Sequence, residues 1–79
     1  MKIKLFATLK EKAGASSIDV HIDEAMTVAA LHEVIVQTYP TLAQNLRVSI
    51  ASVNRQYADL ETVVHPADEV AFFPPVSGG

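Results

Sequence analysis

Apolar and polar side chains alternate at the start of the chain, a pattern typical of strands that bury one face. Residues 2–6 predict a half-buried strand with Ile3 and Leu5 turned inward and Phe6 on the outer face. Residues 17–22 alternate strictly and predict a second strand, antiparallel to the first. The side chains expected to share a core are Ile3, Leu5, Ile18, Val20 and Ile22.

Two short helices are indicated by capping-box patterns. Residues 8–11 fit a capping box, so one or two helical turns are predicted over Leu9–Ala13, with Gly14 supplying a left-handed stop. Residues 41–44 repeat the pattern and predict a short helix reaching about Leu46.

The main helix is predicted between Thr27, a good N-cap, and Tyr39, which precedes Pro40. Residues 34–36 are all β-branched and have poor helix propensity, so this helix must depend on packing against a sheet. Its apolar face consists of Val28, Leu31, Val34 and Ile35.

The second half of the chain again has strand and turn signals. Residues 47–53 predict a third strand, residues 54–56 a turn favoured by Asn54, and residues 57–64 a short, less regular edge. Residues 65–68 predict a turn, because Pro66 presets φ. A last strand is expected over 69–73, with Val70 and Phe72 turned inward and Phe73 outward.

This order of strand, strand, helix and two or three further strands predicts an α+β fold with the helix across one face of a sheet. The 79 residues leave room for one domain. We expect it to span residues 1–74, followed by an extended tail over 75–79.

Composition narrows the classes of function. The chain has no cysteine, which excludes disulfides, thiolate metal sites and a nucleophilic thiol. The net charge is −3, and the carboxylates are spread over the chain beyond Lys2, Lys4, Lys10 and Lys12. A nucleic-acid binder would show a basic patch with interleaved aromatic residues, so this charge distribution argues against that class. Nothing resembles a signal peptide or membrane span, so we expect a cytoplasmic protein without a membrane partner.

No catalytic or metal site is indicated by the side chains. His21, His32 and His65 lack metal-ligand spacing and are interpreted as surface or half-buried histidines. Asp68 and Glu69 are neighbours that would point to opposite faces of a strand, so they do not form a catalytic pair. We therefore expect the chain to have no active site of its own.

The end of the sequence carries the remaining candidate chemistry. Pro74 and Pro75 fix φ and lack N–H donors, so a strand must stop pairing there and leave as an extended strut. The side-chain-free Gly78 and Gly79 could enter a narrow channel and deliver the carboxylate of Gly79 to a partner. A frayed terminus without function is the alternative interpretation.

Residues 70–79, Val-Ala-Phe-Phe-Pro-Pro-Val-Ser-Gly-Gly, closely resemble the C-terminus of the small, sulfur-carrying subunits of molybdopterin synthase. These subunits are ubiquitin-like proteins. The resemblance implies a β-grasp fold with a mixed sheet of four to five strands, in which the first and last strands pair in parallel at the centre.

The resemblance also implies a reaction sequence carried out by partners. An adenylyltransferase related to ubiquitin-activating enzymes would use ATP and Mg²⁺ to form an acyl-adenylate on Gly79. A sulfur donor, such as a cysteine desulfurase or a rhodanese, would convert it to a thiocarboxylate. The sulfur would pass to a pterin precursor in the large subunit, with which the family forms a heterotetramer. The chain itself would bind no cofactor or metal.

In this scheme Gly79 is the modified residue, and Val76, Ser77 and Gly78 belong to the segment that enters the channel. Pro74 and Pro75 position that segment. Phe6, Tyr57 and Phe73 are the candidates for an apolar docking patch. Edge packing is the alternative for Phe6 and for Tyr57, which departs from the aliphatic residue expected at its position.

Three other functions remain open at this stage. A sulfur carrier for thiamine or another thiolation pathway would use the same chemistry. A ubiquitin-like modifier would form isopeptide bonds to lysines after the same activation. A β-grasp interaction module with an inert tail would lose nothing on deletion of Gly78 and Gly79.

Overall fold

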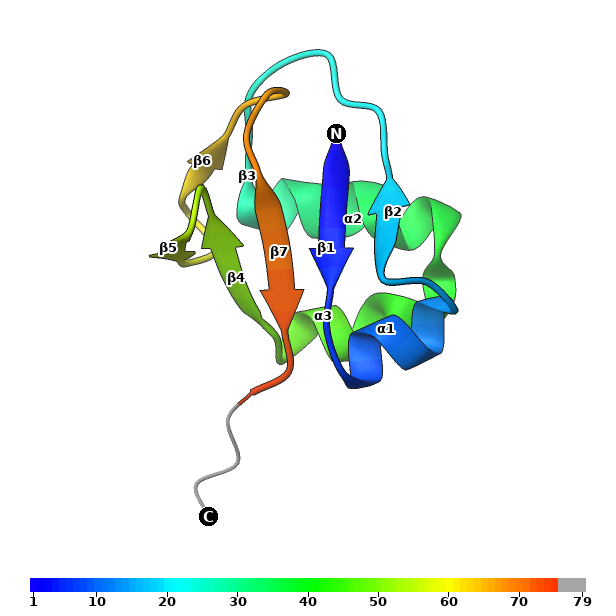
Figure 1. Cartoon of the computed structure of the whole chain (residues 1–79). Helices are drawn as coiled ribbons and strands as arrows, with labels where there is room; N and C mark the ends of the chain where they lie inside the picture. Colours follow the sequence, from blue (N-terminus) through cyan, green and yellow to red (C-terminus); the bar gives the residue numbers. More distant parts are fainter. Residues whose placement is uncertain (76–79) are drawn as a thin grey trace.

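Two strands from opposite ends of the chain lie side by side at the centre of the sheet. The computed structural model describes residues 1–75. Strand β1 (Lys2–Leu5) pairs in parallel with β7 (Val70–Phe73), with Leu5 opposite Phe72 (Figure 1). The parallel pairing that the resemblance implies is confirmed.

The other strands extend the sheet on both sides of this central pair. Strand β2 (Ser17–Asp19) pairs antiparallel with β1. On the other side, β4 (Ile50–Val53) is antiparallel to β7, and β5 (Gln56–Ala58) forms the edge. The order β2-β1-β7-β4-β5 makes a mixed five-stranded sheet, which confirms the predicted α+β, β-grasp fold.

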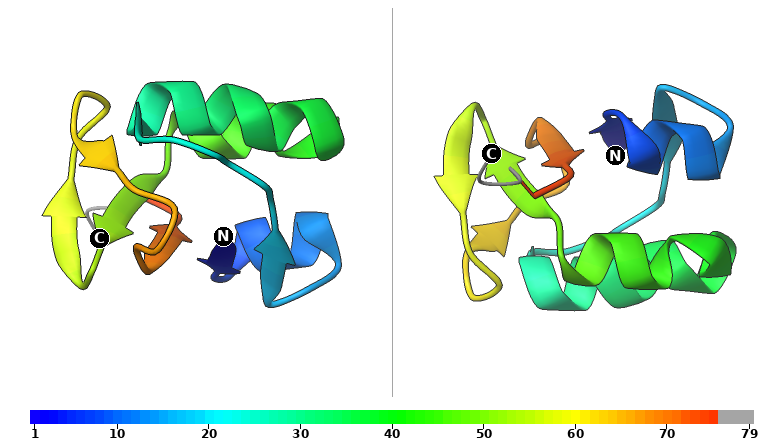
Figure 2. Two further views of the ribbon diagram at one scale, coloured as in Figure 1. Left: turned by 90° about the horizontal axis from the view of Figure 1, so that it is seen from above. Right: turned by 90° about the horizontal axis from the view of Figure 1, so that it is seen from below.

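The helices cover one face of the sheet and one end of it. Helix α2 (Val28–Thr38) runs across one face, as both views in Figure 2 show. Helix α1 (Thr8–Ala13), the 3₁₀ turn η1 (Pro40–Leu42) and α3 (Ala43–Arg47) pack together near the ends of β1 and β7 (Figure 1). Within residues 1–75, no helix has the length and apolar character needed to cross a bilayer.

The core lies between the sheet and α2. Every strand side chain predicted to point inward is buried: Ile3, Leu5, Ile18, Val20, Ile22, Val70 and Phe72. On α2, Val28, Leu31 and Ile35 are buried, and Val34 packs against them partly exposed. Full burial of such a side chain contributes about 1.5–3 kcal/mol, which outweighs the few tenths of a kcal/mol that a β-branched residue costs a helix. Packing therefore holds α2, as expected.

Two of the predicted helix boundaries are confirmed by their backbone geometry. The Oγ1 of Thr27 accepts the N–H of Ala30 at 3.2 Å and caps the start of α2. Gly14 has φ 73°, and its N–H donates to the carbonyl of Lys10 at 3.0 Å to close α1. A left-handed residue at this position satisfies carbonyls that the helix end leaves unpaired.

Both predicted short helices form, but the prediction that a capping box starts each of them is wrong. Helix α1 already includes Thr8 and follows Ala7, which has φ 52° and makes no side-chain cap. Helix α3 begins at Ala43 without a side-chain cap, after a 3₁₀ turn that Pro40 starts. Because the fixed φ of a proline suits the first helical position, the chain turns before Thr41 can act as a cap.

Strand boundaries also differ from the prediction, by one residue at the end of β1 and at the start of β7 and by more in two other strands. The third strand starts at Ile50 rather than at residue 47, because both the N–H and the Oγ of Ser49 donate to the carbonyl of Leu46. The second strand ends at Asp19 rather than at residue 22, although the alternating burial continues.

A second, two-stranded sheet was not predicted. Strand β3 (Met26–Thr27) pairs antiparallel with β6 (Val63–Val64). The β6 strand lies within the segment that the sequence predicts as an irregular edge. Strands of two residues are too short for alternation to reveal.

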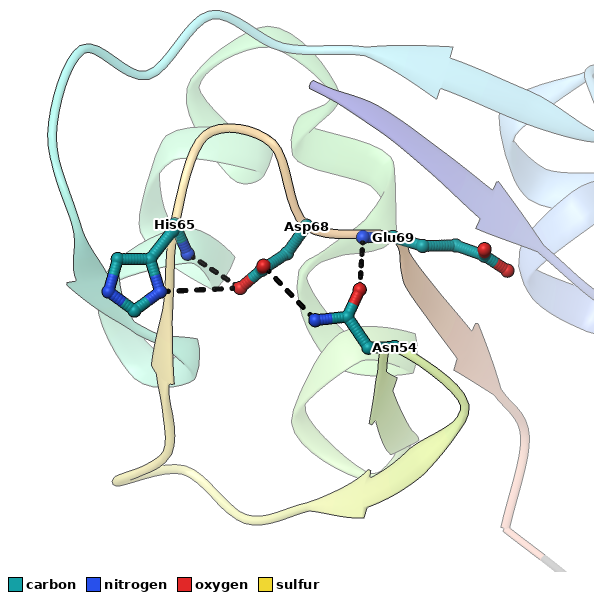
Figure 3. Close-up of polar contacts among 4 residues, drawn as sticks. All are labelled: Asn54, His65, Asp68 and Glu69. Carbon is teal, nitrogen blue, oxygen red and sulfur yellow. Dashed lines mark hydrogen bonds and ion pairs between the residues drawn. The ribbon is translucent and has the colours of Figure 1, made fainter.

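Asn54 ties the β4–β5 turn to the start of β7 (Figure 3). It has φ 51°, as the predicted turn requires, and its Oδ1 accepts the N–H of Glu69 at 2.9 Å. Its Nδ2 donates to Asp68 at 3.1 Å, and the Asp68 carboxylate also accepts the backbone N–H of His65 at 2.8 Å. One side chain therefore holds two turns together where β7 begins.

We expect Asn54→Gly to lower the free energy of unfolding by about 1 kcal/mol, since it removes these side-chain bonds but keeps the left-handed turn. Asn54→Ala should lower it by about a further 1 kcal/mol, because a Cβ without a compensating polar group disfavours φ near 50°. Urea denaturation of the three proteins measures both steps. Equal stabilities for wild type and Asn54→Gly would contradict the bridging role.

The stability of the fold should depend on the ionisation of Asp68. The backbone N–H of His65 and then the Asn54 amide donate to this carboxylate and lower its pKa below its usual value. A carboxyl with a lowered pKa in the folded state contributes stability above its unfolded pKa of about 3.9, and loses this contribution as the pH falls through the folded value.

Wild type should therefore lose more free energy of unfolding between neutral pH and pH ~3 than Asp68→Asn does, because the variant has no carboxyl to protonate at this position. Denaturant titrations of both proteins across this range measure the difference. The other carboxyls are common to both and cancel in the comparison. Parallel pH profiles would show that the Asp68 contacts add no stability.

Candidate functional site

Two aromatic rings stack where β1 and β7 end. Leu5 and Phe72 are opposite each other in the parallel register, so the next residues, Phe6 and Phe73, lie side by side at the end of the strand pair. Their ring centroids are 4.6 Å apart, with 7° between the ring planes. Phe6 is 41% exposed and Phe73 36% exposed. The predicted outward orientation of both is confirmed, and their role as an interface stays a prediction.

The exposed apolar surface continues onto β4. Ile50 is opposite Phe73 in the antiparallel register and is half-buried. Residues directly opposite each other in adjacent strands point to the same face, so Ile50 and Phe73 share the face that α2 leaves open. We call Phe6, Ile50 and Phe73 the aromatic patch.

Tyr57 lies on the same face of the sheet as Ile50, but on the edge strand, and its ring does not stack on the aromatic pair. It is 77% exposed on the edge strand β5 and is opposite Ser52, one side-chain step along β4 from Ile50. Among the described residues, the stacked aromatic pair is formed by Phe6 and Phe73 and does not include Tyr57. The structure therefore brings two of the three predicted docking residues into contact.

The predicted tail follows directly from the patch. β7 ends at Phe73, and the next two residues, Pro74 and Pro75, are half-buried and exposed. The predictions for Val76, Ser77, Gly78 and Gly79 lie outside the described residues 1–75. The structure describes where the tail begins, at Pro74 and Pro75, directly after the stacked ring of Phe73.

The three histidines form no common site. His21 contacts Asp23 at 2.6 Å and His65 contacts Asp68 at 3.5 Å, both at the surface. The ring of His32 packs edge-on against that of Phe72, with 5.2 Å between the ring centroids. Burial lowers the pKa of the His32 imidazole. Within residues 1–75, no three His, Cys, Asp or Glu side chains come together as metal ligands would.

A hollow of about 550 Å³ lies between α2 and α3 and is lined by His32, Glu33, Arg47 and Leu60, among others. Its charged groups are of both signs, and the Nε2 of His32 is buried without a hydrogen-bond partner among the described residues. The ring of His32 packs against Phe72 of the core. We assign His32 to the packing of α2.

Sequence reasoning missed a group of lysines next to the aromatic patch. Lys2, Lys4 and Lys10 line a hollow together with Phe6. Alternation along β1 could have placed the first two on one face with Phe6, but only the fold brings α1 and its Lys10 beside them.

Comparison with known proteins identifies relatives of similar length. The molybdopterin synthase sulfur carrier subunit of Dictyostelium discoideum is 38% identical over 82 residues, covering 99% of this chain and 94% of the relative. Small archaeal modifier protein 1 of Haloferax volcanii is 33% identical over 88 residues, covering the whole of both chains.

The fold matches a solved structure of the same archaeal protein. The crystal structure of SAMP1 from Haloferax volcanii superimposes with a TM-score of 0.82 at 35% identity, covering 100% of this chain and 98% of that chain. A sequence model of the ThiS family matches residues 3–79. Because this match extends over nearly the whole sequence, and whole-length relatives exceed 30% identity, the chain belongs to the ThiS family.

Proposed function

We propose that this chain is the sulfur carrier of molybdopterin synthase. The observation that carries the proposal is the course of β7, which ends beside the exposed Phe6–Phe73 pair and continues through Pro74-Pro75 toward the Gly-Gly end. A partner that covers the patch would receive the tail. The 38% identity to a sulfur carrier subunit of molybdopterin synthase supports the same function.

The proposed chemistry begins with activation of the Gly79 carboxylate. A carboxylate oxygen attacks the α-phosphorus of ATP, pyrophosphate leaves, and an acyl-adenylate forms. ATP and Mg²⁺ would be held by an adenylyltransferase related to ubiquitin-activating enzymes. The activation is needed because a carboxylate offers no good leaving group at neutral pH.

Sulfur then replaces the adenylate. The terminal sulfur of a persulfide on a donor protein attacks the carbonyl carbon, AMP leaves with its electron pair, and an acyl disulfide forms. A thiol then attacks the donor's sulfur, so that a disulfide remains on the donor and a thiocarboxylate remains on Gly79; free sulfide would give the thiocarboxylate directly. The sulfur of this group is anionic and nucleophilic at neutral pH, as thiolates are. The chain has no cysteine, so the sulfur would be carried at the end of the chain rather than on a thiol side chain.

The acceptor would be a pterin precursor bound to the large subunit of molybdopterin synthase. Four residues beyond Pro75 span at most roughly 13–14 Å when extended, which is enough to reach the bottom of a pocket. The aromatic patch would dock on the large subunit at the mouth of that pocket. We propose a heterotetramer of two carriers and two large subunits.

A second candidate function is protein modification. It is favoured by the relative called small archaeal modifier protein 1, which matches this chain over its whole length. The activation step would be the same, but a lysine amine would attack the acyl carbon and form an isopeptide bond. The two functions therefore differ in the acceptor and share the activated Gly79.

We expect sulfur to replace one oxygen of this chain when it is incubated with ATP, Mg²⁺, a sulfide source and the host adenylyltransferase. Intact-mass spectrometry measures the change, which equals the mass of sulfur less that of oxygen. A chain without Gly79 is the control and should keep its mass. An unchanged mass in the full chain, with an enzyme active on another carrier, would contradict the proposal. A ladder of lysine conjugates would favour the modifier.

Phe73→Glu should abolish binding to the large subunit, because a carboxylate in the aromatic patch would be buried without a partner. Phe73 lies at the end of β7 with its ring partly exposed, so the fold should be retained. Co-elution on size-exclusion chromatography measures binding, and circular dichroism checks the fold.

Val63→Glu is the matched control for this substitution. Val63 is 48% exposed but lies on β6, in the separate two-stranded sheet. The Val63→Glu variant should bind the large subunit as the wild-type chain does. Co-elution of Phe73→Glu at the wild-type level would rule out the aromatic patch as the docking surface.

A further inference from the structure

A basic hollow adjoins the aromatic patch. It has a volume of about 300 Å³ and lies at the open side of β1. Its lining residues are Lys2, Lys4, Leu5, Phe6, Lys10, Ser16 and Ser17. We call Lys2, Lys4 and Lys10 the lysine cluster.

Strand β1 and helix α1 supply the lysine cluster, and β2 borders the hollow. Lys2 and Lys4 alternate with the buried side chains of β1 and therefore lie on the face that α2 does not cover. Lys4 is opposite Ser17 of β2 in the antiparallel register. Lys10 reaches the hollow from α1. All three lysines are exposed.

The lysine cluster forms no ion pair within the described part of the chain. Asp19 is opposite Lys2 in the register, but its ion pair is with the amino group of Met1 at 3.6 Å. The chain as a whole has a net charge of −3, so this positive hollow contrasts with the rest of the protein. Such a local field attracts anions.

Phe6 joins the hollow to the aromatic patch. It lines the hollow and also stacks on Phe73. A protein that covers the stacked rings must therefore lie over or beside the lysine cluster. Covering ammonium groups with a surface that lacks negative charge would cost desolvation free energy without compensation.

We propose that the lysine cluster binds carboxylate side chains of the partner that covers the aromatic patch. This inference rests on the proposed function and takes that partner to be the large subunit. Its docking face would have an apolar centre opposite Phe6 and Phe73 and acidic residues opposite the hollow. The acidic residues would steer the encounter and set its orientation, as charges at the rim of an interface do.

A protein surface explains the hollow better than a small free anion does. The ammonium groups are exposed on flexible stems, and an isolated exposed ion pair contributes little to binding. A free anion held by such groups alone would bind weakly. Carboxylates on a surface already held by the aromatic patch act at a high effective concentration, so the same contacts become useful.

The test compares Lys10→Glu with Lys12→Glu in binding to the large subunit. Both lysines are exposed residues of α1 and both substitutions change the charge equally, but Lys12 lines a different hollow, with Gln44 and Asn45. We expect Lys10→Glu to weaken binding about tenfold at low salt, mainly through slower association, and less as salt rises. Lys12→Glu should bind nearly as wild type does. Surface plasmon resonance measures both rates.

Equal weakening by the two substitutions would overturn the proposal, because it would indicate a response to net charge alone. Wild-type binding by Lys10→Glu and by a Lys2→Glu/Lys4→Glu variant would also overturn it. Inorganic phosphate that binds the wild-type chain but not the double variant, without affecting the complex, would identify an anion site instead.

The proposed function is tested separately from this inference. If the variants bind as wild type does while Phe73→Glu does not bind, the lysine proposal fails and the docking role of the patch stands. If the unaltered chain fails to bind the large subunit, both are overturned. Circular dichroism of each variant confirms that a loss of binding is not a loss of fold.

Discussion

The parallel pairing of β1 with β7 is the constraint on which the rest of the structure depends. It joins the first and last strands at the centre of the sheet, so Leu5 and Phe72 meet in the core and Phe6 and Phe73 meet at its end. A parallel pair cannot be closed by a tight turn, and the intervening chain forms α2 and the remaining strands. The core and the candidate docking surface thus come from one pairing.

This pairing separates the stable part of the chain from the part proposed to react. The described residues supply a packed sheet and helix, and they contain no metal-ligand cluster. The proposed reactive group is a main-chain carboxylate, for which partner proteins would provide the nucleotide, the sulfur and the catalytic side chains. The fold contributes a fixed exit for the tail and a surface beside that exit.

The two ends of β7 have different tasks. Its start is held by Asn54 and Asp68, which link the turns on either side of it (Figure 3). Its end leads past the stacked rings to Pro74. A strand fixed at its start and paired on both sides has a defined direction, so the chain leaves the body at a defined point. This geometry suits the proposed carrier, which would present its tail to more than one partner.

The sequence by itself determined the buried side chains of the first, second and last strands, most of the buried face of α2, where α2 begins and that Phe73 faces outward, because alternation and capping are local properties. The sequence also indicates the Gly-Gly tail, because the candidate reactive group there is a main-chain carboxylate and needs no other residue of this chain beside it. Only the tertiary structure decided that Ser49 turns back to Leu46, that β3 pairs with β6 and that Lys10 joins Lys2 and Lys4. These features depend on contacts between residues far apart in the chain, or on competition between two local structures. Neither of these produces a periodic pattern of apolar residues in the sequence.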